Sequence, residues 1–331
     1  MSLLDRSFPT MGATARLVLA DRAASAEPSP RLTHAADDAQ ALLAALHRAW
    51  TRFDPDSELN RASAHPDAVV PDASAHLRAL VRAGAWAGRA SGGLVDITLG
   101  AQIVEAGYAS HWDGSQTVPL KTALAAAPPR AAAAPDPAAR WQALGVDRHA
   151  GTIRRPIGAT LDSGGIGKGL AADLVARRLV GLRYIVDVGG DLALGHGGGG
   201  HHDVTVTHPL TGAPAHVLRI DGGGVATSGI HRRMWVDNRT GAPAHHLLDP
   251  RTGRPAWTGL LAATAVGRSA TEAETLAKTA YLKGPRGARA TLAALGGVLV
   301  HEDGAVEVIP PLRRAADRAV RDLAAATAAT A

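Results

Sequence analysis

The residues best suited to acid–base chemistry lie in one short segment, 246–253, which reads His-Leu-Leu-Asp-Pro-Arg-Thr-Gly. Pro250 fixes φ near about −65° and Gly253 accepts a positive φ, so this segment is predicted to form a rigid turn after a short apolar strand. Such a turn would hold His246 and Asp249 near one place, as proton transfer requires. Alone, the segment also fits an ordinary hairpin corner, and the rest of the sequence must decide.

A second candidate is the glycine-rich segment 161–169, which precedes a predicted helix over residues 169–180. Clustered glycines let backbone N–H groups approach an anion at a helix N-terminus, and Lys168 adds positive charge. The spacing is not that of a Walker loop, because no glycine stands five residues before Gly167 and Gly169 occupies the Ser/Thr position. A phosphate site and a tight connection therefore both stay open.

Two other segments combine glycines with carboxylates. Residues 186–191 fit a strand followed by a turn with an Asx hydrogen bond. In residues 93–98, Asp96 could belong to a site or cap the following helix. The histidines of segment 196–202 surround four glycines, and we interpret this segment as a surface loop, because a flexible loop makes a poor metal site.

Composition excludes several classes of protein. The chain has 331 residues, enough for one large domain or two intimate ones. It contains no cysteine, which excludes disulfides, thiolate metal sites, a cysteine nucleophile and a lipid-modified N-terminal cysteine. The formal net charge of +5 is scattered, and no basic stripe alternates with aromatic residues, so no nucleic-acid partner is expected.

The sequence also bears on location. Residues 1–12 contain neither a basic region nor an apolar stretch, so no signal peptide is predicted. No apolar run is long enough to span a bilayer. The sequence therefore predicts a cytoplasmic protein.

Hydrophobic periodicity predicts helices and strands that mix without regular βα alternation, which indicates an α+β fold. The predicted helices cover residues 35–53, 75–89, 139–144, 169–180 and 271–282. The predicted strands cover residues 14–19 (as an edge strand), 152–154, 184–188, 192–195, 204–208, 216–220 and 261–266. Residues 109–140 form a low-complexity Ala/Pro segment, interpreted as a surface excursion or a poorly ordered insertion.

Taken in order, these segments resemble the motifs of the ApbE family, the FAD:protein FMN transferases. The matching segments are residues 11–12, 53–59, 93–98, 162–173, 187–191, 226–229 and 246–253. The last two match the family's Ala-Thr-Ser-Gly and His-Ile-Ile-Asp-Pro-Arg-Thr-Gly motifs almost letter for letter. Ala13, Val95 and Ile97 replace the Thr, Phe and Pro that are usual in the family.

The resemblance implies the family's α+β flavin transferase fold, with two intimate lobes and an FAD cleft between them. Residues 1–310 would form this domain, with 109–140 as an insertion and 311–331 as a C-terminal Arg/Ala helical tail. FAD would be the substrate, and the partner would be a flavoprotein whose Ser or Thr hydroxyl receives FMN while AMP is released. Two alternatives stay open: an FAD pyrophosphatase, and an FAD-binding protein without catalysis.

The resemblance also implies roles for individual residues. The cofactor-binding residues would be Met11, Phe53, Leu94, Val95, Asp96, Asp162, Lys168 and Leu248. His246 would be the base for the acceptor hydroxyl, and Asp249 would orient His246 or the turn. His245, the residue before His246, is predicted to point to the opposite side of a strand and to tolerate substitution.

One departure from the family affects the metal. The family's motif Ala-Asp-Ala-Leu-Ala-Thr supplies an Asp and a Thr to Mg²⁺, and the matching residues here are Glu274 and Lys278. Glu274 could ligate a metal together with carbonyls near Gly165 and Ala277, but an ammonium cannot ligate a cation. Glu274 and Lys278 are either an i,i+4 ion pair on the helix surface, or a site in which Lys278 replaces the metal and acts in catalysis.

Overall fold

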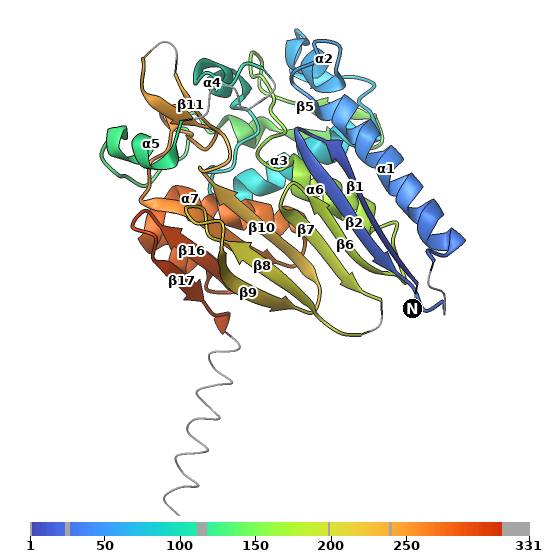
Figure 1. Ribbon diagram of the computed structural model, residues 1–331. Coiled ribbons are helices and arrows are strands. Elements are labelled where there is room, and N and C mark those ends of the chain that lie inside the picture. The colour runs from blue at the N-terminus through green and yellow to red at the C-terminus, as the bar shows by residue number, and fades with distance from the viewer. Residues whose placement is uncertain (1, 24–26, 111–117, 198, 238–239, 313–331) are drawn as a thin grey trace, which may run out of the picture.

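A large antiparallel sheet forms the centre of the molecule, shown as a computed structural model in Figure 1. The structure describes residues 2–23, 27–110, 118–197, 199–237 and 240–312. Within them, the sheet has eight strands in the order β1-β2-β6-β7-β10-β15-β16-β17. Their bounds are β1 Leu3–Thr10, β2 Ala13–Ala20, β6 Arg183–Val188, β7 Asp191–His196, β10 Gly223–Gly229, β15 Leu260–Gly267, β16 Gly297–His301 and β17 Val306–Ile309.

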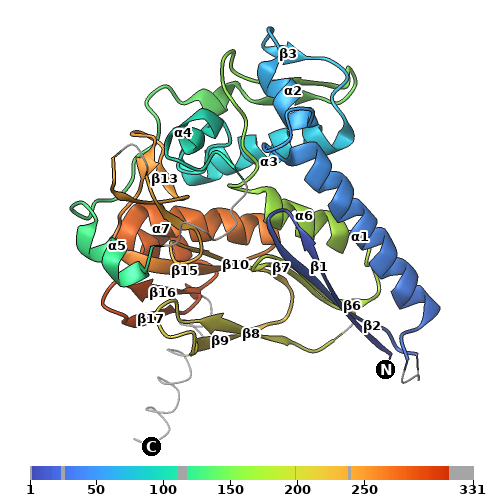
Figure 2. The ribbon, with the colours of Figure 1, turned by 45° about the horizontal axis from the view of Figure 1, so that its top comes forward.

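Helices cover one face of this sheet and a hairpin covers part of the other (Figure 2). The helices are α1 (Pro30–Trp50), α6 (Gly167–Ala176) and α7 (Ala270–Leu292), and the hairpin pairs β8 (His202–Thr207) with β9 (Pro214–Ile220). Buried side chains form one cluster around α1 and α6, a second around α7 and β15, and a third between the sheet and the hairpin.

The remaining elements lie on the helical side, away from the hairpin (Figure 2). They are α2 Glu58–Ala64, β3 Val69–Val70, α3 Ala75–Ser91, α4 Gly100–Glu105, α5 Leu120–Ala126, η1 Arg140–Ala143, β4 Gly145–Asp147, β5 Thr152–Arg154, β11 Met234–Val236, β12 Pro243–His245, β13 Leu248–Asp249 and β14 Arg254–Pro255. In the part of the chain described here, no helix has the length and apolar character needed to cross a bilayer.

Helix α1 is fixed by its cap and by its apolar face. The Ser29 side chain accepts a hydrogen bond from the Leu32 backbone N–H, which satisfies a free donor of the first turn. Buried residues recur along the helix as far as Trp50, whose indole donates to the His76 carbonyl at 3.1 Å. The chain leaves the helix at Thr51, so this anchored end determines where the next two residues lie.

Helices α6 and α7 approach closely at a glycine. A Cβ at Gly169 would lie 2.6 Å from the Ala270 carbonyl oxygen, closer than real Cβ atoms come, so only glycine fits without a shift. The two helices are also joined by Asp173, whose carboxylate accepts hydrogen bonds from the backbone N–H groups of Ala270 and Thr271. The start of α7 is therefore held against α6.

The α+β class predicted from the sequence is confirmed, with some corrections. The strand predicted over 14–19 is β2, but it is not an edge strand, because it pairs with β6 on one side and with β1 on the other. Strand β1 was missed because Asp5, Arg6 and Ser7 hide its pattern, as expected for an edge. The predicted helix over 271–282 continues in α7 to Leu292, across a kink at Gly284.

The Ala/Pro segment 109–140 is more ordered, where described, than its composition predicts. Residues 120–126 form α5, and Ala123 is fully buried. The stretch that follows hydrogen-bonds to the core, through Ala131 N–H to the Trp257 carbonyl and Ala133 N–H to the Leu282 carbonyl. Residues 111–117 and the predicted tail helix from residue 313 onward lie outside the described residues.

Candidate active site

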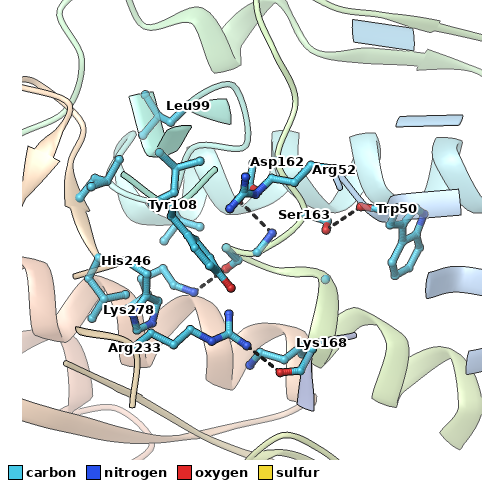
Figure 3. A pocket seen from close by; sticks show the side chains of 18 of the residues that line it. Trp50, Arg52, Leu99, Tyr108, Asp162, Ser163, Lys168, Arg233, His246 and Lys278 are labelled. Carbon is cyan, nitrogen blue, oxygen red and sulfur yellow. Dashed lines mark hydrogen bonds and ion pairs between the residues drawn. The ribbon is translucent and has the colours of Figure 1, made fainter. Parts of the chain in front are cut away.

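A cavity of about 150 Å³ lies between the C-terminal end of α1, the N-terminal end of α6 and the middle of α7. Distant parts of the chain line it, as Figure 3 shows. Among the lining residues are Met11, Gly12, Trp50, Arg52, Phe53, Leu94, Val95, Asp96, Tyr108, Asp162, Gly165, Lys168, Arg233, His246, Leu248 and Lys278. The fold thus brings most of the sequence motifs to one hollow.

The residues singled out from the sequence meet here. All eight predicted cofactor-binding residues line the cavity, and so do His246, Lys278 and Gly165. Three predicted residues do not line it. Glu274 is 2% exposed and lies behind the two lysines, Ala277 belongs to the core around α7, and Asp249 lies in the turn beyond Leu248.

Arg52, Phe53 and Tyr108 form one wall of the cavity. The guanidinium carbon of Arg52 lies 4.2 Å from the Phe53 ring centroid and 4.5 Å from that of Tyr108, and its Nε is 3.2 Å from Asp162 Oδ1. Tyr108 in turn stacks on Trp235, with centroids 5.5 Å apart. Arg52 Nη2 is buried and has no hydrogen-bond partner among the described residues. This wall can contact a flat ring and still offers one donor.

The turn between β1 and β2 places Met11 at the cavity. Met11 and Gly12 both have positive φ, 51° and 65°, which is the geometry of a two-residue type I′ hairpin turn. The Gly12 carbonyl accepts a hydrogen bond from Arg233 Nη2 at 3.2 Å. The N-terminal hairpin is thereby tied to the loop after β10.

Asp96 presents a free acceptor. Its Oδ1 accepts hydrogen bonds from both the backbone N–H and the hydroxyl of Thr98, while its Oδ2 is buried without a partner among the described residues. Burial raises the pKa of Asp96, against the lowering effect of these bonds. Helix α4 begins only at Gly100, so Asp96 is not its N-cap, and the capping interpretation is wrong.

Positive charge gathers at the N-terminal end of α6. Lys168 projects from its first turn and pairs with Asp191 through a short contact, while its Nζ lies 3.9 Å from Glu274 Oε1. Burial lowers the pKa of Lys168, but the two carboxylates more than offset that effect, so the net shift is upward. The ammonium stays charged beside a helix end whose dipole also favours anions.

His246 lies in the chain between β12 and β13 and lines the cavity. Burial, followed by the charges of Arg233 and Lys278 and the neighbouring His245, lowers its pKa well below 6.5. The ring is therefore neutral at ordinary pH, and its Nδ1 has no side-chain partner among the described residues. A neutral imidazole beside cations can accept a proton from a hydroxyl.

Asp249 acts on the turn and not on His246. Its Oδ1 accepts hydrogen bonds from the backbone N–H groups of Ala134 and Arg251, at 3.0 and 3.1 Å. Gly253 has φ 66°, as the sequence predicted, and its N–H donates to the Asp249 carbonyl. His245 was predicted to tolerate substitution, but it is fully buried, with its ring 4.7 Å from that of Trp257.

The Glu274–Lys278 pair is not on the helix surface. The side chain of Glu274 is 2% exposed and that of Lys278 is 13% exposed. Lys278 Nζ donates to the Gly165 carbonyl at 2.8 Å. The interpretation of this pair as a solvent-exposed ion pair is therefore wrong.

Several cavity residues were missed from the sequence. Arg52 stands beside a predicted residue, but an arginine after a helix usually lies in solvent. Tyr108 precedes a low-complexity segment and Arg233 follows the Ala-Thr-Ser-Gly motif, so neither has a pattern of its own. The scarcity of aromatic residues was the available signal, since three tyrosines in 331 residues make each one notable.

Comparisons with known proteins agree with this arrangement. The profile of the ApbE family matches residues 11–300. The FAD:protein FMN transferase of Escherichia coli K12 is 34% identical over 136 residues, which cover 39% of this chain and 38% of that protein. That of Treponema pallidum is 30% identical over 156 residues, covering 43% and 42%. The chain thus matches less than half the length of these curated relatives.

Solved structures support the fold over a longer span. The ApbE protein of Thermotoga maritima superposes with a TM-score of 0.74 at 21% identity, covering 92% of this chain and 96% of that chain. The flavinyl transferase ApbE of Pseudomonas stutzeri, in its apo form, gives 0.70 at 24% identity, covering 92% and 94%. At these identities the likeness concerns the fold.

Proposed function

Because the chain belongs to the ApbE family, we propose that it is an FAD:protein FMN transferase. One observation carries the proposal: the eight residues expected to bind FAD, drawn from five separated segments of the sequence, all line one cavity. The FAD:protein FMN transferases of E. coli and T. pallidum are similar to this chain over part of their length. The cytoplasm, expected from the sequence, stays a prediction, as do the domain limits 1–310 and 311–331.

In the proposed reaction, the oxygen of an acceptor Ser or Thr hydroxyl forms a bond to the FMN phosphorus of FAD. The bond from that phosphorus to the bridging oxygen breaks, and AMP leaves with that oxygen. His246 takes the hydroxyl proton, since its ring is neutral and faces the cavity. The protein must align this in-line attack and neutralise the pyrophosphate, and little covalent work remains for it.

Different walls would bind different parts of FAD. The aromatic wall of Phe53 and Tyr108 suits a flat ring, and the free Asp96 Oδ2 suits a ring N–H or an amino group. The pyrophosphate would lie toward the end of α6, where Lys168 and Lys278 converge. In this proposal Asp249 is a positioning residue, because its carboxylate holds the turn that carries His246.

The test follows FMN and AMP separately. The purified protein is incubated with FAD, with and without a mixture of synthetic Ser- and Thr-containing peptides. The proposal expects AMP release that depends on peptide, together with a peptide mass increase equal to FMN less one water. AMP and free FMN without peptide would instead identify a pyrophosphatase, and bound FAD with no product would identify a binding protein.

A further inference from the structure

Lys278 occupies a position between two oxygen atoms that would suit a cation. Its Nζ lies 2.8 Å from the Gly165 carbonyl oxygen and 3.6 Å from Glu274 Oε1. These are the carbonyl and the carboxylate expected to hold Mg²⁺, and residue 278 is the expected third ligand. An ammonium cannot ligate a metal ion, so the residues present do not fit Mg²⁺.

The carboxylate of Glu274 is held in place by a hydrogen bond from the protein backbone. Its Oε2 accepts a hydrogen bond from the Gly169 backbone N–H at 2.9 Å, across the close contact of α6 and α7. Its Oε1 is buried and makes no hydrogen bond among the described residues. The nearest positive charges to Oε1 are Lys278 at 3.6 Å and Lys168 at 3.9 Å. A buried carboxylate requires such compensation.

The charges of this cluster already balance. Lys168 and Lys278 supply two positive charges, while Asp191 and Glu274 supply two negative charges. A divalent ion at the same place would add two positive charges within a few ångströms of two ammonium groups, where repulsion is strong. Both lysines line the cavity, so their positive ends remain available to an anionic ligand.

We propose that the Lys278 ammonium replaces the divalent cation at the FAD pyrophosphate, with Glu274 holding it in place. This inference rests on the proposed function. The transition state gains negative charge on the departing AMP oxygen, and a fixed ammonium at the pyrophosphate would stabilise it without a metal. FAD binding and transfer are then independent of divalent ions.

The first experiment measures binding, not activity. Flavin fluorescence titrations give the Kd for FAD and for riboflavin, which lacks both phosphates, in EDTA and in Mg²⁺. The FAD Kd should agree within about twofold between these two conditions. Lys278→Met should weaken FAD binding by about 10- to 100-fold, the usual worth of a charge-assisted hydrogen bond, and leave riboflavin binding unchanged.

Matched variants separate charge from folding. Lys278→Met combined with Glu274→Gln removes both charges and keeps the acceptor for Gly169 N–H, and it should lose FAD affinity in the same way. Lys283→Met changes an exposed lysine of the same helix and should leave both affinities unchanged. An unaltered ratio of FAD to riboflavin affinity in both Lys278 variants would overturn the proposal.

The second experiment needs no FAD. Binding of Mn²⁺, measured by electron paramagnetic resonance, should be absent in the unmodified protein and reach about one ion per chain after Glu274→Asp with Lys278→Thr. Stoichiometric Mn²⁺ binding by the unmodified protein, or FAD affinity lost in EDTA and restored by Mg²⁺, would refute the substitution. If no flavin binds at all, the proposed function fails, and Mn²⁺ binding still decides whether Lys278 replaces the metal.

Discussion

The protonation state of His246 allows a quantitative test of the proposed transfer. A histidine with the ordinary pKa of about 6.5 is about one quarter neutral at pH 6 and about 97% neutral at pH 8, so a rate that needs it would rise about fourfold. Burial and the charge of Arg233 lower the pKa of His246 well below that value, so the neutral fraction of its ring varies less over this pH range. Transfer at saturating FAD should therefore rise by clearly less than about fourfold between about pH 6 and pH 8.

Removal of the imidazole ring measures how much His246 contributes to the transfer rate. His246→Ala should lower the transfer rate by roughly 10²–10⁴-fold, the usual contribution of a positioned general base, and change the Kd for FAD by less than about threefold. His149→Ala, at an exposed position, is the matched control and should transfer at the parental rate. The control shows whether loss of any histidine disturbs the protein.

The assay is the appearance of peptide-bound FMN fluorescence, with the pKa of His246 followed separately by NMR. Arg233→Met removes a positive charge that opposes protonation, so it should raise the pKa of His246 and move the acidic limb of the rate profile upward. A fourfold rise with a midpoint near pH 6.5 in the unmodified protein would show that the titrating base is another group. Parental transfer by His246→Ala would remove this residue from the mechanism.

Three other predictions concern binding and stability. Gly169→Ala should destabilise the protein by about 1–3 kcal/mol in urea unfolding, because its Cβ would meet the Ala270 carbonyl at 2.6 Å, whereas Gly222→Ala, with no contact below 3.5 Å, should not. Burial lowers the pKa of His245 to about 3, so between pH 6.5 and 3 the unfolded chain binds one more proton than the folded chain, and the free energy of unfolding decreases as the pH is lowered. Between pH 7.5 and pH 5 this costs about 2 kcal/mol of stability, and His245→Phe should abolish that loss. An equal decrease in the free energy of unfolding for the variant and the unmodified protein would contradict the prediction. Arg52→Met should weaken FAD binding about tenfold in fluorescence titration, since the stacked guanidinium is lost, and unchanged affinity would place FAD elsewhere.

The sequence predicted best the elements whose pattern is local. The period of apolar residues predicted α3 (Ala75–Ser91) and β5 (Thr152–Arg154) closely, and the strands predicted over 204–208 and 216–220 correspond to β8 and β9. It missed β1, because an edge strand carries polar residues that break the alternation. It could not decide between the two interpretations of residues 109–140, a surface excursion and a poorly ordered insertion, because the order of the described part comes from hydrogen bonds to distant carbonyls, such as that of Trp257.

The site residues that belong to the family's sequence motifs could be predicted, and the others could not. Eight residues assigned by resemblance line one cavity, although their order along the chain says nothing about distance in space. Arg52, Tyr108 and Arg233 were missed because their importance depends on stacking and on contacts between segments far apart in sequence. Such contacts leave no period in the sequence.

Glu274 and Lys278 show why spacing alone cannot distinguish a surface ion pair from a built-in cation. On any helix, residues at i and i+4 share one face, whether that face meets water or the interior. Burial decides between them, and it follows from Gly169, which lets α6 approach α7 closely enough for its N–H to bind the Glu274 carboxylate. With that carboxylate fixed and Lys278 bonded to Gly165, our proposal is that replacing the family's Asp and Thr by Glu and Lys changes which cation the site holds. The departure from the family motif is therefore best understood as a change in chemistry built into the contact between two helices.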